Sequence, residues 1–499
     1  MSAPLILGTN SIKDTGFDVA NSYFIGADAK TSVTNTTPTN TKIFTISFWI
    51  KMHEFPTSSG DRPIFGYFSD SNNQAYMYLR NDGTLGIFEN ESGNTKIDIR
   101  TSQVLRDPGA FYNIIMAIDT SQGTAANRLK LYINGSQVSS FAAENYPAQD
   151  YASQWNENSL VFHVGGTATN DGNHVKGTFC EFAFIDGQQL DQTSFGEFDE
   201  DTPTVFKPIS LSTLTFGNNG FLLEFKETGT SANSSGIGAD TSGNNRHHSV
   251  TNITATDQRT DTCTNNFCTL NPLINNGFTY ENGNLEIAGG ADNHFAWGNF
   301  AGKMDNASAG WYFEMKVNSG GTIGSSGRGM RMGIGSFDFA MSDGLGTDGG
   351  FPLSSDTGKL IQNNKPEGYQ LADNGGSNLV DLGVTPSVGD IINVAWKNSK
   401  VFIGINGTYY AADGGSDGDP ANGTNPSHTI SSTHQSDAWI PVITASLSNG
   451  ADGCSFNFGN PAFTISSSNT DSEGFGNFEY AVPSGYFALC TKNLSEYGG

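Results

Sequence analysis

The acidic segment Glu197-Phe-Asp-Glu-Asp201 is the stretch of this sequence closest to a catalytic arrangement. Its acidic residues Glu197, Asp199 and Asp201 alternate with other residues, so on a strand they would project from one face. Two carboxyl groups held about 5–5.5 Å apart on such a face can carry out retaining glycoside hydrolysis. The segment lacks the apolar residues that would bury the other face of a catalytic strand. We therefore expect a solvated acidic loop, and cleavage of a polysaccharide is a minor alternative.

Other catalytic motifs are missing from the sequence, which contains no Gly-x-Ser-x-Gly elbow, no P-loop and no His-Glu-x-x-His. The histidine cluster Arg246-His247-His248 has no further ligands at the spacing of a zinc site. The five cysteines are odd in number and scattered, which is typical of buried thiols, although Cys263 and Cys268 could pair across a loop. We expect a protein that is not an enzyme and needs no cofactor.

Calcium is the one ion that the sequence leaves open. Carboxylates and carbonyl oxygens in glycine-rich loops are suitable ligands for a hard cation. The candidate ligands are Asp343, Asp348, Asp413, Asp417 and Asp419. None of them follows the twelve-residue register of an EF-hand, so Ca²⁺ binding is an expectation from composition alone.

Two tryptophans lie in polar stretches and are candidates for carbohydrate binding. An exposed ring can stack on the apolar face of a sugar while neighbouring amides bond its hydroxyl groups. The candidate residues are Trp155 with Asn156 and Asn158, and Trp297 with Asn293 and Asn299. Ordinary packing or a subunit contact is the alternative for each tryptophan.

The charge of the chain restricts its partners. Lys and Arg number 25 against 50 Asp and Glu, which gives a net charge of −25. Phosphate backbones and anionic membranes would be repelled, so nucleic acid is not an expected partner. No run of 18 apolar residues occurs and the N-terminus lacks the features of a signal peptide, so we expect no membrane insertion.

The elements that must position any site are strands. Phe44, Ile46, Phe48 and Ile50 alternate with polar residues over 44–52, the period of a strand with one buried face. Trp49 breaks this alternation, so we expect a second layer to cover it and the strand to lie in mid-sheet. Tight turns such as Asn134-Gly135 and Asn406-Gly407 indicate hairpins. No helical period is evident, and 499 residues exceed a single core.

The sequence therefore predicts an all-β chain of two β-sandwich domains joined by an irregular connector. The first domain is expected over 1–205, the connector with a short strand over 206–271, and the second domain over 272–499. The connector assignment depends on the Ser, Thr, Asn and Gly content of 228–269.

Several segments resemble known families. The first domain is similar to the laminin-G-like, concanavalin-A-like jelly rolls of phage tail and virion proteins at Phe44–Lys51, Gln103–Pro108, Leu131–Gly135 and Phe184–Gly187. The connector resembles the same phage proteins at Asp240–Asn245 and Thr264–Leu273. The last domain resembles a SPRY domain at Trp311–Met315, Met332–Gly335, Ile405–Gly407 and Asn457–Phe463.

The resemblance implies a non-enzymatic virion protein of a tailed phage, located on the tail or the capsid surface. The preferred role is a tail-fibre or appendage component that binds a glycan or protein of the host surface, as a homo-oligomer and, by analogy with fibre proteins, a trimer. The alternative is a capsid-decoration or tail-adaptor protein that binds other virion proteins.

Overall fold

The computed structural model describes residues 14–498, apart from 27, 56–59, 169–173, 275–277, 289–293, 320–329, 337–357, 363–369, 373–377, 382–386, 431–434 and 446–452. Its chain forms two compact units, Thr15–Asn265 and Asn266–Gly499. Strands account for most of the regular structure, beside the short helices α1 (Ala125–Arg128) and α3 (Thr491–Tyr497), so the predicted all-β fold class is confirmed. Within the described ranges, no helix has the length and apolar character needed to span a membrane.

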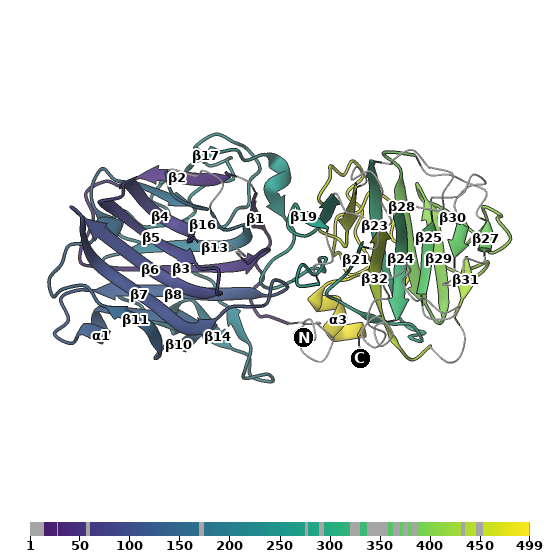
Figure 1. Ribbon diagram of the computed structural model, residues 1–499, viewed down its shortest axis with the longest axis horizontal. Helices are drawn as coiled ribbons and strands as arrows, with labels where there is room; N and C mark the ends of the chain where they lie inside the picture. Colours follow the sequence, from purple (N-terminus) through teal and green to yellow (C-terminus); the bar gives the residue numbers. More distant parts are fainter. Residues whose placement is uncertain are drawn as a thin grey trace. The chain divides into compact units, whose positions relative to one another are not determined.

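The first unit is a sandwich of two eight-stranded antiparallel sheets. One sheet, which we call the covered sheet, has the order β10 (Ser136–Gln137), β9 (Leu129–Ile133), β8 (Phe111–Asp119), β3 (Ile43–Met52), β13 (Gly177–Asp186), β1 (Ser22–Ile25) and β18 (Gln258–Arg259), with β16 (Phe221–Leu223) beside β13. The other, which we call the open sheet, has the order β11 (Phe141–Asn145), β7 (Asn94–Val104), β6 (Thr84–Glu91), β5 (Asn73–Leu79), β4 (Arg62–Asp70), β12 (Val161–Val164), β2 (Lys30–Thr34) and β17 (Ser249–Thr251). Figure 1 shows β2, β4, β5, β6, β7 and β11 following one another from the top of this unit to the bottom.

The strand that the sequence placed in mid-sheet is β3, which pairs with β8 on one side and β13 on the other. Its inward side chains Phe44, Ile46, Phe48 and Ile50 are all 0% exposed and belong to the core between the sheets. The ring of Phe48 stacks on that of Phe182 in β13, with centroids 5.3 Å apart. The alternation of the sequence thus places the core, as predicted.

The outward face of the covered sheet is closed by a second apolar layer. Trp49 stacks there on Phe206, with ring centroids 6.0 Å apart, which explains why a large ring interrupts the alternation of β3. Further along the same face, Phe195, Leu211 and Phe216 pack on Ile115 and Ile185. Phe206 belongs to a small ribbon of β14 (Gly196–Phe198) and β15 (Phe206–Pro208). Residues 195–216 therefore cover this face.

The segment expected as an irregular connector contributes strands to the first unit. Its β16 pairs with β13, its β17 pairs with β2, and its β18 pairs with β1. These pairings join residues that are far apart in the chain, as in Ser249 opposite Ser32. Short strands of this kind carry little periodicity of their own, because their partners come from elsewhere in the sequence.

The second unit contains two further sheets. One has the order β19 (Thr279–Glu281), β20 (Glu286–Ala288), β33 (Gly453–Asn457), β23 (Gly310–Ser319), β28 (Ile391–Lys397), β29 (Lys400–Ile405) and β30 (Thr408–Tyr410), with β31 (His428–Thr429) beside β29 and β34 (Tyr486–Ala488) beside β23. The other has the order β21 (His294–Trp297), β32 (Ala438–Ala445), β24 (Met330–Ser336), β25 (Gly358–Gln362), β26 (Gln370–Ala372) and β27 (Asn378–Asp381), with β22 (Gly302–Lys303) beside β32. Asn406 and Gly407 join β29 to β30 with φ of 51° and 79°, as a two-residue hairpin turn requires.

Candidate functional site

The outward face of the open sheet carries aromatic rings that remain partly exposed. Along β5, Ala75, Met77 and Leu79 point into the core, so Tyr76 and Tyr78 point outward. On β6 the core residues Leu85 and Ile87 leave Phe88 outward, and on β7 Ile97 and Ile99 leave Asp98 and Arg100 outward. Tyr76, Phe88, Asp98 and Arg100 are each partly exposed. We call this surface, centred on β5, β6 and β7, the open face.

Strand register brings these side chains into two rows across the sheet. In the first row, Asp98 lies opposite Phe88, Phe88 opposite Tyr76, and Tyr76 opposite Gly66 of β4. In the second row, Arg100 lies opposite Gly86, and Gly86 opposite Tyr78. The Tyr76 ring centroid is 5.6 Å from that of Phe88 and 5.5 Å from that of Tyr78. Each row therefore ends in a charged side chain beside aromatic rings.

A glycine allows one of these rings to lie flat. An added Cβ at Gly86 would be 2.1 Å from Cζ of Tyr78 and 2.5 Å from its hydroxyl oxygen, so the Tyr78 ring lies across Gly86. Tyr78 is only 5% exposed and forms the floor of the open face. Tyr76 and Phe88 lie beside it.

Three polar side chains around the rings make no hydrogen bond or close ion pair in the described part of the chain. Asp61, which precedes β4, and Asp98 and Arg100 on β7 have no side-chain hydrogen bond or ion pair within the described residues. Desolvation raises the pKa of Asp61, and the nearby Arg80 opposes this rise. Burial, with Asp61 and Asp98 nearby, raises the pKa of Tyr78 to about 12, so its hydroxyl stays protonated. The open face thus offers carboxylate acceptors, a guanidinium donor and phenol hydroxyls.

His163 continues the first row beyond Gly66. It lies opposite Gly66 on β12 and is 8% exposed. Burial lowers the pKa of His163 to about 4, so the ring is neutral at neutral pH. Its Nδ1 is buried without a hydrogen-bond partner among the described residues. The row therefore ends on β12 in a neutral ring that is largely buried.

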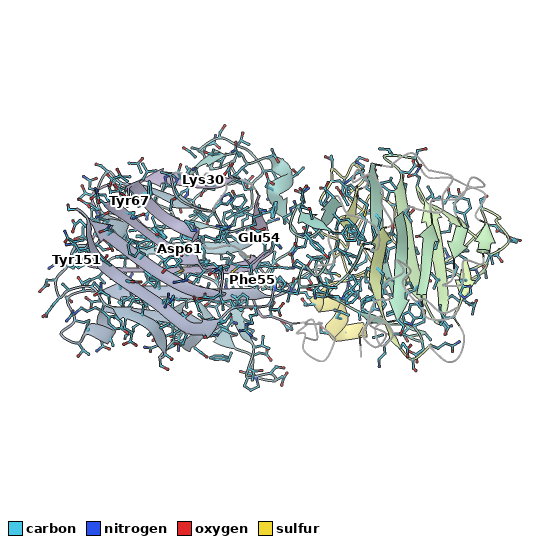
Figure 2. The ribbon with its side chains drawn as sticks, in the orientation of Figure 1. Lys30, Glu54, Phe55, Asp61, Tyr67 and Tyr151 are labelled. Carbon is cyan, nitrogen blue, oxygen red and sulfur yellow. The ribbon has the colours of Figure 1, made fainter. Side chains whose placement is uncertain are left out.

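The buried carboxylate of Glu89 holds the loop of residues 151–154 beside the open sheet. Glu89 of β6 is 0% exposed and accepts hydrogen bonds from the Tyr151 hydroxyl (2.8 Å), the Ser153 hydroxyl (2.8 Å) and the Gln154 backbone N–H (2.7 Å). Burial raises the pKa of Glu89 to about 7 despite these donors. In Figure 2, Tyr151 lies at the left edge of the first unit and Asp61 lies over its middle. Glu89 therefore anchors the loop and is separate from the open face.

The structure places Trp155 in the core, which corrects the expectation that it is an exposed sugar-binding ring. Trp155 is 0% exposed and packs edge-on against Phe65, with centroids 5.3 Å apart. Asn156 donates to Asp186 Oδ1 (2.7 Å) and to the Asn40 carbonyl (3.0 Å), and its Oδ1 accepts from Asn219 (2.9 Å). Asn156 therefore serves a buried network, and of the three candidates here only Asn158 is exposed.

Trp297 is also buried, at 5% exposure, and it lies in β21 where it pairs with Val442. Asn299 is 4% exposed, and its Oδ1 accepts from the Thr269 backbone N–H (2.9 Å). Asn293 lies outside the described residues. The expected exposure of the Trp297 ring is therefore wrong.

The acidic loops offer no assembled metal site in the described part of the chain. Asp413 accepts from the Gly415 backbone N–H, Asp417 from the Asn425 side chain, and Asp419 from Asn422. Within that part, no group of three or more His, Cys, Asp or Glu is placed to hold a metal ion. Asp343 and Asp348 lie outside the described residues. Calcium binding therefore stays a prediction without a located site.

The acidic segment 197–201 lies on the β14–β15 ribbon and in the turn that follows. Asp199 accepts from the backbone N–H groups of Asp201 (3.1 Å) and Thr202 (2.8 Å) and lies 3.3 Å from Lys207 Nζ. The Thr202 hydrogen bond and Lys207 lower the pKa of Asp199. Glu197 lies 3.6 Å from the same ammonium group. These contacts are those of a turn and a surface ion pair.

The disulfide between Cys263 and Cys268, which the sequence left open, is not formed. Cys263 packs in the first unit beside Cys180, whereas Cys268 is buried in the core of the second unit. All five cysteines are free thiols.

Sequence reasoning missed the residues of the open face for an identifiable reason. The alternation of apolar residues over 75–79 and 85–88 places Tyr76, Tyr78 and Phe88 on one side of the strands. No strand was expected over 94–104, where Ile97, Ile99 and Val104 are the only apolar residues among many polar ones. This strand, β7, carries Asp98 and Arg100.

Comparison with known proteins gives one family match. The profile of the concanavalin A-like lectin/glucanases superfamily, in its laminin-G form, matches residues 26–192. This range contains the open face and most of both sheets of the first unit. No curated protein matches the chain significantly.

Solved structures show similar folds at low identity. Domains LG4-5 of the mouse laminin alpha1 chain are 12% identical, with 89% of this chain and 90% of that chain covered and a TM-score of 0.28. The SPRY domain of human HERC1 is 14% identical, with 38% of this chain and 96% of that chain covered and a TM-score of 0.25. A putative carbohydrate binding protein from Bacteroides ovatus is 13% identical, with 47% and 58% covered and a TM-score of 0.29. At these values the likenesses carry no statement about function.

Proposed function

We propose that this chain is a non-enzymatic adhesion component of a tailed-phage particle, and that its first unit binds a glycan or protein of the host surface through the open face. The observation that carries the proposal is the open face itself, where Tyr76 and Phe88 lie partly exposed beside Asp98 and Arg100, whose side chains make no hydrogen bond within the described residues. The phage assignment is supported by the sequence segments that resemble phage virion proteins, and the binding role by the lectin superfamily match.

The physical argument starts from the difference between the two sheet faces of the first unit. The covered sheet buries its outward rings beneath residues 195–216, as Trp49 beneath Phe206. The open sheet leaves Tyr76 and Phe88 partly exposed beside Asp98 and Arg100. An aromatic surface framed by a few convergent polar groups is the usual composition of a ligand site. A ligand that stacks on the rings would also satisfy the polar groups.

The ligand of a single open face would be bound weakly, so we propose that the protein acts as a homo-oligomer, as fibre proteins do, with a trimer as the expected form. Linked copies turn the second and third binding events into intramolecular ones and raise the overall affinity without a new contact. Other virion proteins would then be attachment partners of the chain.

Phage adsorption to host cells in the presence of excess purified protein tests the proposal. The folded full-length protein should block adsorption in a dose-dependent way, and heat-denatured protein should not. The double variant Tyr76→Ala/Phe88→Ala should lose this effect. A matched control is Phe198→Ala, because Phe198 is a 41% exposed ring on β14, outside the open face.

Two other outcomes would contradict the proposal, one for the location of the binding site and one for host recognition itself. If the double variant blocks adsorption as well as the unchanged protein does, the open face is not the binding site. If the folded protein does not block adsorption at all, host recognition is wrong, and a decoration or adaptor role that binds other virion proteins replaces it.

A further inference from the structure

The open face presents hydrogen-bonding groups that complement hydroxyl groups. A carboxylate only accepts hydrogen bonds and a guanidinium only donates them, whereas a hydroxyl does both. Asp98 and Arg100 stand two residues apart on β7, on the same side of the strand, and neither has a side-chain partner within the described residues. One hydroxyl-rich ligand can donate to Asp98 and accept from Arg100 at the same time.

The same surface has no surplus of positive charge. Lys30 donates to the carbonyls of Thr167 and Ala168 (3.0 Å each). Arg80 pairs with Asp82 (3.8 Å), and Lys96 pairs with Glu91 (3.5 Å). The cations around the open face are therefore engaged, apart from Arg100, which has Asp61 in its vicinity.

The open face also has an extended form. The first row runs from Asp98 through Phe88, Tyr76 and Gly66 to His163, across five neighbouring strands. Four strand spacings of about 4.8 Å give a length of about 19 Å. Gly66 and His163 are buried, so the exposed part of this row is Asp98, Phe88 and Tyr76. The exposed part covers two strand spacings, about 10 Å, and accommodates a short chain of linked sugar units.

We infer that the open face binds a chain of neutral sugar units laid across the strands from β7 toward β12, and that it disfavours acidic polysaccharides. The inference rests on the proposed function and names its ligand class. Sugar rings stack on Tyr76 and Phe88, while their hydroxyl groups donate to Asp98 and accept from Arg100. Carboxylate or sulfate groups of an acidic chain would approach Asp61 and Asp98 on a protein of net charge −25.

The salt dependence of binding separates the two ligand classes. Ion pairs between exposed charges weaken as salt is added, because the screening length falls to about 3 Å at 1 M ionic strength. Binding through stacking and neutral hydroxyl groups should therefore change less than about threefold between low and high salt.

Calorimetric titration of the full-length protein with polysaccharides tests the inference. The neutral probes are dextran, mannan and galactan, and the acidic probes are polygalacturonate and hyaluronate. At least one neutral probe should bind, with little salt dependence, and the acidic probes should bind at least about tenfold more weakly. Tyr76→Ala and Asp98→Ala should each weaken the neutral probe by about tenfold.

Two controls keep this experiment interpretable. Phe198→Ala, outside the open face, should leave the affinity unchanged. Circular dichroism and the unfolding midpoint of each variant should match those of the unchanged protein, and Asp98→Asn, which keeps the shape of the side chain, replaces Asp98→Ala if that variant is unstable.

The results that overturn the inference differ from those that overturn the proposed function. Stronger binding of an acidic probe, or neutral binding that survives both Tyr76→Ala and Asp98→Ala, contradicts the inferred ligand. If no polysaccharide binds while Tyr76→Ala/Phe88→Ala still abolishes the block of phage adsorption, the neutral-sugar inference is wrong and the proposed function stands.

Discussion

The ring of Tyr78 lies across Gly86, so that a Cβ at position 86 would be 2.1 Å from Tyr78 Cζ. Gly86→Ala therefore displaces the end of the Tyr78 ring and disturbs the floor of the open face. We expect a roughly tenfold loss of ligand affinity, measured by calorimetry, with the fold retained. Gly123→Ala is the matched control, because an added Cβ there meets nothing within 4 Å. Equal affinities for both variants would show that the Tyr78 position is unimportant.

Trp155 should act on stability and not on binding. Its ring is 0% exposed and contacts Phe65 and Phe162 in the core. Trp155→Ala should lower the free energy of unfolding by about 3–5 kcal/mol, as other large core deletions do. Urea denaturation measures this loss. A variant of unchanged stability but reduced ligand binding would return Trp155 to the candidate site.

Glu89 should make the stability of the first unit depend on pH. Burial raises its pKa from 4.5 to about 7, so between these values the folded state binds a proton that the unfolded chain has released. The contribution is fully present below pH 4.5 and is lost as pH rises through 7. The free energy of unfolding should fall by about 1.4 kcal/mol per pH unit within this window.

Glu89→Gln isolates this effect, because glutamine keeps the shape and an acceptor oxygen for Tyr151 and Gln154. Burial also raises the pKa of Glu181, to about 8, and this group adds a slope of the same sign to both proteins. The difference in stability between the two proteins, followed by chemical denaturation from pH 4 to 9, should therefore vary with pH only between about 4.5 and 7. A constant difference would contradict the raised pKa of Glu89.

Two lysine–aspartate pairs in the first unit should differ sharply in their effect on stability. Lys51 Nζ lies 3.0 Å from Asp261, and the side chains are 0% and 1% exposed. Lys51→Met leaves Asp261 buried without this cation and should cost about 3–5 kcal/mol. Lys42 and Asp150 are 2.9 Å apart with 38% and 63% exposure, so Lys42→Met should cost less than about 1 kcal/mol. Thermal unfolding measures the stability of the two variants. Similar losses would contradict the claim that only the buried Lys51–Asp261 pair matters strongly for stability.

Much of the fold follows from local patterns in the sequence. The alternation of Phe44, Ile46 and Phe48 predicts the buried face of β3, and the interruption at Trp49 predicts a covering layer, which Phe206 supplies. The Asn406-Gly407 turn predicts the hairpin of β29 and β30. These features depend on neighbours in the chain, so a single sequence displays them.

The open face and the environment of the tryptophans depend on distant contacts. Trp155 lies among polar residues because Ser153 and Gln154 bind Glu89, and Asn156 binds Asp186. From the sequence, this polarity resembles that of an exposed loop. The strands β16, β17 and β18 pair with β13, β2 and β1, and no local pattern indicates such partners.

Hydroxyl-radical footprinting tests the central claim, that ligand lies on the open face, most directly. The full-length protein is oxidised alone and bound to host-cell envelopes, and modification of each aromatic side chain is measured by mass spectrometry. The account predicts that oxidation of Tyr76 and Phe88 falls on binding while that of the exposed Phe198 stays unchanged. Unchanged oxidation of Tyr76 and Phe88 in protein that is demonstrably bound would contradict it.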